Sequence, residues 1–185
     1  MVFLLIGNGF EEIEALTCVD AFSRAEVKVT MLSVTGDREV TGRSGITVVT
    51  DAPMAQADIE KAEMLILPGG DVNRNGNYGS CAAAEDFIRR AFAAKVPVAA
   101  ICAAPTVLDR LELINGKSCT CYPSCSTDIK NAVYAGEINA MTDGDLITGK
   151  APGAAADFAL TALKYLRGAE VAAEVAADMY HDFKG

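Results

Sequence analysis

The residue with the clearest chemical potential is Cys102, which stands between a short apolar run and a helical segment. Val98–Ile101 is typical of a buried strand, and Pro105 suits the first turn of a helix because it has no N–H to leave unsatisfied. A strand that passes into a helix through one residue holds that side chain in a tight turn. The positive end of the helix dipole favours a thiolate, the nucleophilic and oxidisable form. The spacing alone leaves a second interpretation open, a small buried residue at a strand end.

Backbone groups close to this thiol could stabilise negative charge. The segment Leu67–Gly70 reads Leu-Pro-Gly-Gly after an apolar run, and glycine lets the main chain approach a ligand closely. We expect the N–H groups of Gly70 and Ala103 to form an oxyanion hole beside Cys102, with Gly69 in the same pocket.

Three glutamates follow the first apolar run, Met1–Ile6, and could supply acid–base chemistry. Glu11, Glu12 and Glu14 fit a first helical turn, where acidic residues complement the helix dipole. If the first strand neighbours the strand before Cys102, one of these carboxyls can also reach the thiol. Such a carboxyl, crowded and partly desolvated, should have a raised pKa and stay protonated. It could then move a proton to and from a substrate.

Composition excludes several classes of function. The chain has 185 residues, with 16 basic and 25 acidic side chains and a net charge of −9, so nucleic acid is a poor candidate partner. Its single histidine excludes metal sites with two histidine ligands, and we expect neither a metal nor an organic cofactor. The longest uncharged central stretch, Val96–Leu108, is too short to cross a membrane. Six cysteines without a secretory start predict a reduced, cytoplasmic protein.

The elements that must position these residues alternate between strand and helix along the chain. Strands are predicted at Met1–Ile6, Val27–Ser33, Ala62–Leu67, Val96–Ile101, Lys117–Thr120, Ala132–Tyr134, Ile138–Met141 and Leu146–Ile147, with a short antiparallel excursion from Val40 to Thr50. Helices are predicted at Glu11–Ala25, Cys81–Ala94, Ala104–Leu113, Ala154–Tyr165 and Glu170–Phe183. This alternation predicts one doubly wound α/β domain, residues 1–185, whose mostly parallel sheet has helices on both faces. Its ligand crevice should lie beyond the carboxyl ends of the strands.

A second group of thiols, Cys119, Cys121 and Cys125, has a spacing that admits three interpretations. Two small core residues and a loop thiol are the simplest. Cys121 could instead be a resolving partner for an oxidised Cys102, and metal binding is the third alternative.

Several motifs together, rather than any one of them, carry a resemblance to a known family. They are Gly9–Glu14, Val19–Asp20, Lys28–Thr30, Gly42–Arg43, Leu67–Gly70, Ala99–Pro105, Ala151–Gly153 and Asp157–Leu160. Their order and spacing resemble the ThiJ/PfpI superfamily, in the branch of the Parkinson-associated protein deglycase and the YajL-type proteins. The resemblance extends over most of the chain.

The resemblance implies roles for individual residues. The family's nucleophilic cysteine falls on Cys102, its paired glutamate on Glu14 and its supporting glycine amide on Gly70. The arginine near the thiol pocket falls on Arg43, and contacts in a homodimer are implied around the first helix, including Arg24. The fold implied is flavodoxin-like. The activities implied are glutathione-independent glyoxalase, sugar-adduct deglycase, redox-sensing chaperone and oxidation of the thiol to a sulfinate.

The chain departs from the family pattern at two positions. Ala103 stands where the protease-like branch has a histidine, which disfavours a cysteine peptidase or amidase. Tyr122 stands at the pocket position where the deglycase has a histidine, so a proton relay must rest on Glu14 or on Tyr122 itself. His181, in the C-terminal helix, is expected to stay outside the site. The main hypothesis is a reactive cysteine acting on small aldehydes, and the alternative is a redox-sensing thiol protein without turnover.

Overall fold

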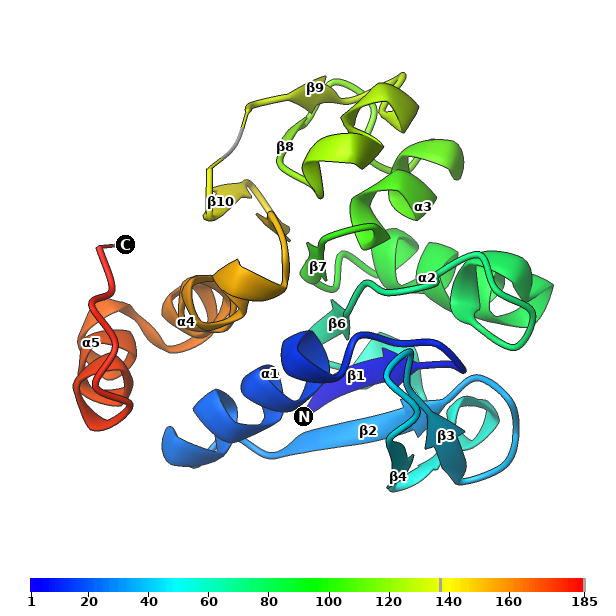
Figure 1. Cartoon of the computed structure of the whole chain (residues 1–185), viewed down its shortest axis with the longest axis horizontal. Coiled ribbons are helices and arrows are strands. Elements are labelled where there is room, and N and C mark those ends of the chain that lie inside the picture. The colour runs from blue at the N-terminus through cyan, green and yellow to red at the C-terminus, as the bar shows by residue number, and fades with distance from the viewer. Residues whose placement is uncertain (137, 185) are drawn as a thin grey trace.

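The computed structural model of the chain describes residues 1–136 and 138–184, and its centre is a seven-stranded sheet (Figure 1). The strand order is β10-β11-β7-β6-β1-β2-β5. The bounds are β1 Val2–Ile6, β2 Val29–Ser33, β5 Ala52–Pro53, β6 Met64–Leu67, β7 Val98–Ile101, β10 Ala140–Asp143 and β11 Leu146–Gly149. Only β10 runs antiparallel to its neighbour, so the predicted mostly parallel α/β sheet is confirmed.

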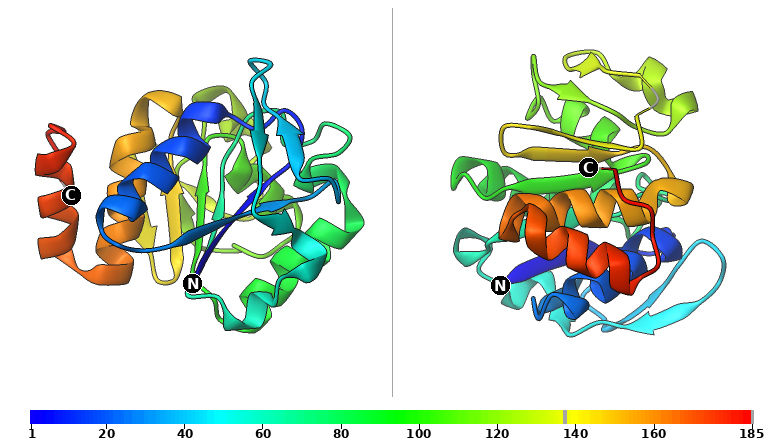
Figure 2. Two further views of the ribbon diagram at one scale, coloured as in Figure 1. Left: turned by 90° about the horizontal axis from the view of Figure 1, so that it is seen from below. Right: turned by 90° about the vertical axis from the view of Figure 1, so that its left-hand side faces the viewer.

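Helices cover both faces of this sheet. One face carries α1 (Glu12–Arg24) and α4 (Ala155–Arg167), with α5 (Ala169–Asp178) packed outside α4, as the left view of Figure 2 shows. The other face carries α2 (Ala82–Ala93) and α3 (Ala104–Arg110). Each face has its own hydrophobic core, and the fully buried residues of β1 alternate between the two. The doubly wound prediction is therefore confirmed.

Shorter elements connect the main ones. The predicted antiparallel excursion is present as β3 (Glu39–Thr41) and β4 (Thr47–Val49). The strands expected near residues 117–120 and 132–134 shrink to β8 (Ser118–Cys119) and β9 (Val133–Tyr134), which pair with each other outside the main sheet. Five 3₁₀ turns were not predicted: η1 Met54–Gln56, η2 Ile59–Lys61, η3 Tyr78–Ser80, η4 Pro123–Asp128 and η5 Pro152–Ala154.

Two helices end earlier than the periodicity predicts. Helix α3 stops at Arg110 instead of Leu113, because Glu112 takes a positive φ of 59° that breaks the helical path. Helix α5 stops at Asp178 instead of Phe183, and Tyr180 has a φ of 53°. Among the helices of residues 1–136 and 138–184, none combines the length and the apolar character needed to cross a membrane.

Strand order answers whether the first strand lies beside the strand that leads to Cys102. The first strand does not neighbour the Cys102 strand, because β6 lies between β1 and β7. A carboxyl at the start of α1 must therefore reach the thiol across the carboxyl end of β6, where Gly69 follows Leu67 and Pro68.

Candidate functional site

Cys102 forms the elbow between β7 and α3. Its φ of 64° lies in the left-handed region that a side chain rarely adopts, a conformation that costs about 1 kcal/mol or more. Its N–H donates to the Gly149 carbonyl at 2.9 Å, and its carbonyl accepts the N–H of Tyr122 at 2.9 Å. Both backbone groups are thus held, and the tight turn expected from the sequence is present.

Glu14 is fully buried in the first turn of α1, and its carboxyl faces the elbow. Oε2 accepts the N–H of Gly69 at 2.6 Å. Within the described residues Oε1 has no hydrogen-bond partner, and the carboxyl as a whole interacts with the Cys102 thiol.

Gly69 lies between the carboxyl and the thiol. A Cβ built on Gly69 would lie 2.6 Å from the Cys102 Cβ, 2.9 Å from the Glu14 Oε2 and 3.0 Å from the Ala103 nitrogen. Real Cβ atoms do not approach other atoms so closely, so only glycine fits here. The missing side chain is what lets Glu14 reach Cys102 across the intervening strand.

The site changes the proton affinity of the carboxyl. Burial raises the pKa of Glu14 from 4.5 to about 7, and the nearby Glu11 carboxylate adds to this effect. The Gly69 N–H, the Cys102 thiol and the Arg43 guanidinium oppose it and keep the pKa from rising further. The raised pKa expected from the sequence is present, and near neutral pH the group can both give and take a proton.

The thiol differs from the expectation that its environment favours a thiolate. Burial raises the pKa of Cys102, which is 7% exposed, and the Glu14 carboxylate raises it further. Hydrogen bonds from the Gly70 and Ala103 N–H groups to the sulfur lower it, but not enough to reverse the direction. The pair therefore holds a thiol beside a base, rather than a preformed thiolate.

The remaining pocket residues lie at the edge of this pair. The Arg43 guanidinium is half exposed and donates to Glu11 Oε2 at 3.2 Å, so it acts on Glu14 through charge and not through contact. The ring of Tyr122 is 42% exposed, and only its backbone N–H bonds to Cys102. Cys121 is buried, and its thiol bonds to the Tyr122 carbonyl at 3.5 Å.

His181 and Arg24 are bound elsewhere. The imidazole of His181 lies 3.0 Å from Asp157 Oδ1, between the C-terminal segment and α4. Arg24 bonds to Asp20 and Asp178 of its own chain. Within the described ranges no group of three or more histidine, cysteine, aspartate or glutamate side chains is placed to hold a metal ion.

An open groove of about 460 Å³ runs beside the elbow. Gly70 and Ala103, whose N–H groups bond to the Cys102 sulfur, both line it, together with polar side chains such as Arg74 and Thr106. A small polar molecule in this groove would therefore lie next to the two amides that face the thiol.

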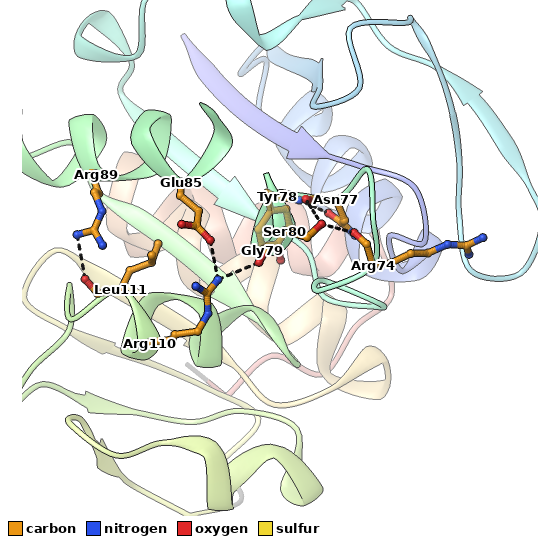
Figure 3. A network of polar contacts seen from close by, with 9 residues as sticks. All are labelled: Arg74, Asn77, Tyr78, Gly79, Ser80, Glu85, Arg89, Arg110 and Leu111. Atoms are coloured by element: carbon orange, nitrogen blue, oxygen red, sulfur yellow. Dashed lines mark hydrogen bonds and ion pairs between the residues drawn. The ribbon is translucent and has the colours of Figure 1, made fainter. Parts of the chain in front are cut away.

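The structure adds one residue that the sequence did not single out, the fully buried Tyr78 of η3. Its hydroxyl donates to the Pro68 carbonyl at 2.5 Å. Around it, Figure 3 shows a polar network in which Arg110 of α3 donates to the Gly79 carbonyl at 2.9 Å and to Glu85 of α2 at 2.8 Å. No spacing rule connects Tyr78 to Pro68, because the contact depends on a loop folding back on the glycine turn.

A flavodoxin-like α/β sheet with a cysteine on a strand-to-helix elbow and a buried glutamate against it defines the class of this protein. The model of the DJ-1/PfpI family matches residues 1–165, and the chain belongs to that family.

Known relatives are similar to this chain over almost its whole length. The chain is 34% identical over 174 residues to protein dj-1beta of Drosophila melanogaster, covering 94% of this chain and 92% of the relative. It is 30% identical over 183 residues to the Parkinson disease protein 7 homolog of Danio rerio, covering 95% and 94%. The crystal structure of Drosophila melanogaster DJ-1beta matches 98% of both chains with a TM-score of 0.92 and 33% identity. A structure of oxidized Toxoplasma gondii DJ-1 matches 98% of both chains with a TM-score of 0.88 and 26% identity.

Proposed function

We propose that this protein converts small reactive carbonyls, with Cys102 as nucleophile and Glu14 as acid and base. The observation that carries the proposal is the pair itself: a carboxyl with a pKa of about 7 lies against a thiol whose sulfur receives two backbone N–H groups. The thiols of Cys18, Cys119, Cys121 and Cys125 lack such a set of partners.

The first step is addition of the thiol to an aldehyde such as methylglyoxal. The ionised Glu14 takes the proton of Cys102 as the carbon–sulfur bond forms, and the carbonyl electrons move to oxygen. The N–H groups of Gly70 and Ala103, which bond to the sulfur, would stabilise the charge on that oxygen. Protonation gives a hemithioacetal.

The second step moves hydrogen within the adduct. Glu14 removes the proton from the former aldehyde carbon and gives it to the neighbouring ketone oxygen, while the hydroxyl proton of the adduct moves to the former ketone carbon, which leaves a thioester on Cys102. Water then cleaves the carbon–sulfur bond, releases a hydroxy acid and restores the thiol. The atoms balance as methylglyoxal plus water giving lactate, without a redox cofactor.

Turnover of methylglyoxal to lactate tests this proposal. Wild type should be active, and both Cys102→Ser and Glu14→Gln should lose at least 100-fold, because each removes a reacting group. Cys125→Ser is the matched control, since it removes a partly exposed thiol bordering the same groove, and should keep its activity. Equal rates in wild type and Cys102→Ser would contradict the assignment of Cys102 as nucleophile.

A second candidate function is redox sensing. The two N–H groups on the sulfur could equally hold the oxygens of an oxidised cysteine, and one similar structure is described as oxidized DJ-1. Intact mass after mild peroxide treatment separates the two functions. A stable gain of two oxygens on Cys102, with no carbonyl turnover, favours the sensor.

The proposed setting is a homodimer in the cytoplasm. The exposed apolar side chains Ile13 and Leu16 on α1 support an interface there, and six unpaired cysteines suit a reducing compartment. Ile13→Glu should lower the molecular mass measured by light scattering to that of one chain, and an unchanged mass would exclude this interface.

A further inference from the structure

The glycine turn beside Glu14 is held from behind by a tyrosine. Tyr78 is fully buried, and its hydroxyl donates to the Pro68 carbonyl at 2.5 Å. Its own N–H donates to the side-chain oxygen of Asn77 at 2.8 Å, and Asn77 is also buried. Strand β6 ends at Leu67, so the Pro68 carbonyl lies beyond the strand and takes its bond from a side chain instead.

One peptide unit connects this hydroxyl to the carboxyl of Glu14. The carbonyl of Pro68 and the N–H of Gly69 belong to the same planar amide and point in opposite directions. The carbonyl accepts from Tyr78, while the N–H donates to Glu14 Oε2 at 2.6 Å. A hydrogen bond to the carbonyl polarises the amide, which makes its N–H a stronger donor.

The hydroxyl is not needed to fill space. The Tyr78 ring packs in the core shared with α2 and α3, and phenylalanine would fill the same volume. The oxygen therefore adds a polar group to the core, at a cost that its bond to Pro68 offsets. Burial and the nearby charges of Glu14 and Cys102 raise the pKa of Tyr78, so the hydroxyl keeps its proton and remains a donor.

We propose that Tyr78 is a positioning residue that acts through the Pro68–Gly69 peptide to fix the Glu14 carboxyl against the Cys102 thiol. Tyr78 orients the peptide plane, the plane orients the Gly69 N–H, and that N–H holds Oε2 and with it the carboxyl that interacts with the thiol. The role rests on the Cys102–Glu14 pair of the proposed function, but not on the carbonyl substrate.

Other charged and titratable groups also act on Glu14 and stay unchanged when Tyr78 is altered. Glu11, just before α1, and Arg43, after β3, act with opposite signs. Cys102 faces the carboxyl from the elbow, and Cys18 lies one helical turn further along α1. The Tyr78 hydroxyl forms a hydrogen bond with none of these groups, so its removal acts on Glu14 through the Pro68–Gly69 peptide.

The test is the pH dependence of Cys102 alkylation by iodoacetamide, read by mass spectrometry of the Cys102 peptide. In wild type the rate should rise with pH through a midpoint near 7, where Glu14 ionises and can take the thiol proton. Tyr78→Phe weakens the Gly69 N–H and leaves the carboxylate less stabilised. The midpoint should move upward by roughly 0.5 pH units, which corresponds to an alkylation rate about twofold lower at pH 7.

Two controls separate positioning from mere packing. Tyr165→Phe removes a hydroxyl that is remote from the network on a tyrosine that is 41% exposed, and should leave the midpoint unchanged. In a Glu14→Gln background Tyr78→Phe should cause no shift, because the group it acts through is gone. An unshifted midpoint in folded Tyr78→Phe, or an equal shift in the Glu14→Gln background, would overturn the proposal.

A second measurement tests the proposal if Tyr78→Phe folds poorly. Wild type grown with 3-fluorotyrosine keeps every ring but has more acidic hydroxyls, so its midpoint should move downward, and no movement would overturn the proposal. Both readouts are independent of carbonyl turnover. A midpoint that shifts as expected in a protein inactive on methylglyoxal would contradict the proposed function and leave the role of Tyr78 standing.

Discussion

Two of the regions that hold buried thiols, the elbow and the segment from β8 to η4, differ in what surrounds the sulfur. At the elbow, Cys102 has a carboxyl against it and two backbone N–H groups on its sulfur. In the segment from β8 to η4, the thiols of Cys119 and Cys121 are equally buried, but their neighbours include other thiols and aspartates. Burial raises the pKa of Cys119 to about 11 and that of Cys121 to about 12, with no donor to oppose it.

The difference lies in the partners and not in the burial. All three thiols have raised pKa values, so thiol acidity does not distinguish the reactive one. Cys102 differs because Glu14, with a pKa of about 7, can accept its proton as it reacts, whereas the other two have no such base. We therefore expect the reactivity of a thiol in this fold to depend on whether a base lies beside it.

The largest effect should come from removing the base. Glu14→Gln should slow alkylation of Cys102 at pH 7.5 by about 100-fold, because the thiol then lacks a proton acceptor. Cys125 serves as an internal control, since it lies outside the pair and should react at its wild-type rate. Peptide mass spectrometry measures both thiols in the same sample, and parallel slowing of the two would point to a general structural change instead.

The same substitution should change how stability depends on pH. The pKa of Glu14 is 4.5 when unfolded and about 7 when folded, so between these values the folded chain keeps a proton that the unfolded chain loses. Stability therefore falls as pH rises from 4.5 to 7, by about 3 kcal/mol in total. Urea unfolding at pH 5 and pH 8 should show this fall in wild type and not in Glu14→Gln. Equal losses in the two proteins would contradict the assignment.

A smaller effect should follow from separating the pair. In Gly69→Ala the new methyl would lie 2.6 Å from the Cys102 Cβ and 2.9 Å from Glu14 Oε2, so both groups must shift. We expect about tenfold slower alkylation of Cys102 and a stability loss of about 1–3 kcal/mol. Gly153→Ala, where an added Cβ meets nothing within 4 Å, is the matched control and should leave both quantities unchanged.

The smallest effect should come from the other thiol region. Cys121→Ser should leave Cys102 alkylation within about twofold of wild type and cost about 1 kcal/mol of stability, because a hydroxyl replaces a buried thiol. The same variant tests whether Cys121 resolves an oxidised Cys102. A higher yield of Cys102 sulfinate after peroxide in Cys121→Ser would contradict the separation of the two thiol regions. It would show that Cys121 normally intercepts the first oxidation product.

Much of this arrangement is predictable from the sequence because strand and helix periodicity are local. The elbow at Cys102 follows from an apolar run that meets Pro105, and the Gly70 and Ala103 amides follow from their neighbours in sequence. The strand order, by contrast, depends on distant packing, so the place of β6 between β1 and β7 was not predictable. The predicted direction of the Cys102 pKa shift was also wrong, because burial and the Glu14 charge outweigh the dipole of a helix of seven residues.

The role of Tyr78 escaped prediction for a related reason. Nothing in a segment that reads Asn-Gly-Asn-Tyr-Gly indicates that its tyrosine points back to Pro68, ten residues earlier. Such contacts are set by how a loop closes over its neighbours, and loop closure is poorly constrained by local residue preference. The residues proposed to do chemistry were therefore easier to find than the residue proposed to align them.

The left-handed elbow has an evolutionary consequence. A cysteine at φ 64° persists only where the surrounding structure enforces that backbone, and glycine would adopt the same conformation without the penalty. Selection for stability alone would thus tend to replace the proposed nucleophile, and populations of this gene freed from the need for thiol chemistry should drift to glycine at position 102 while keeping the sheet around it.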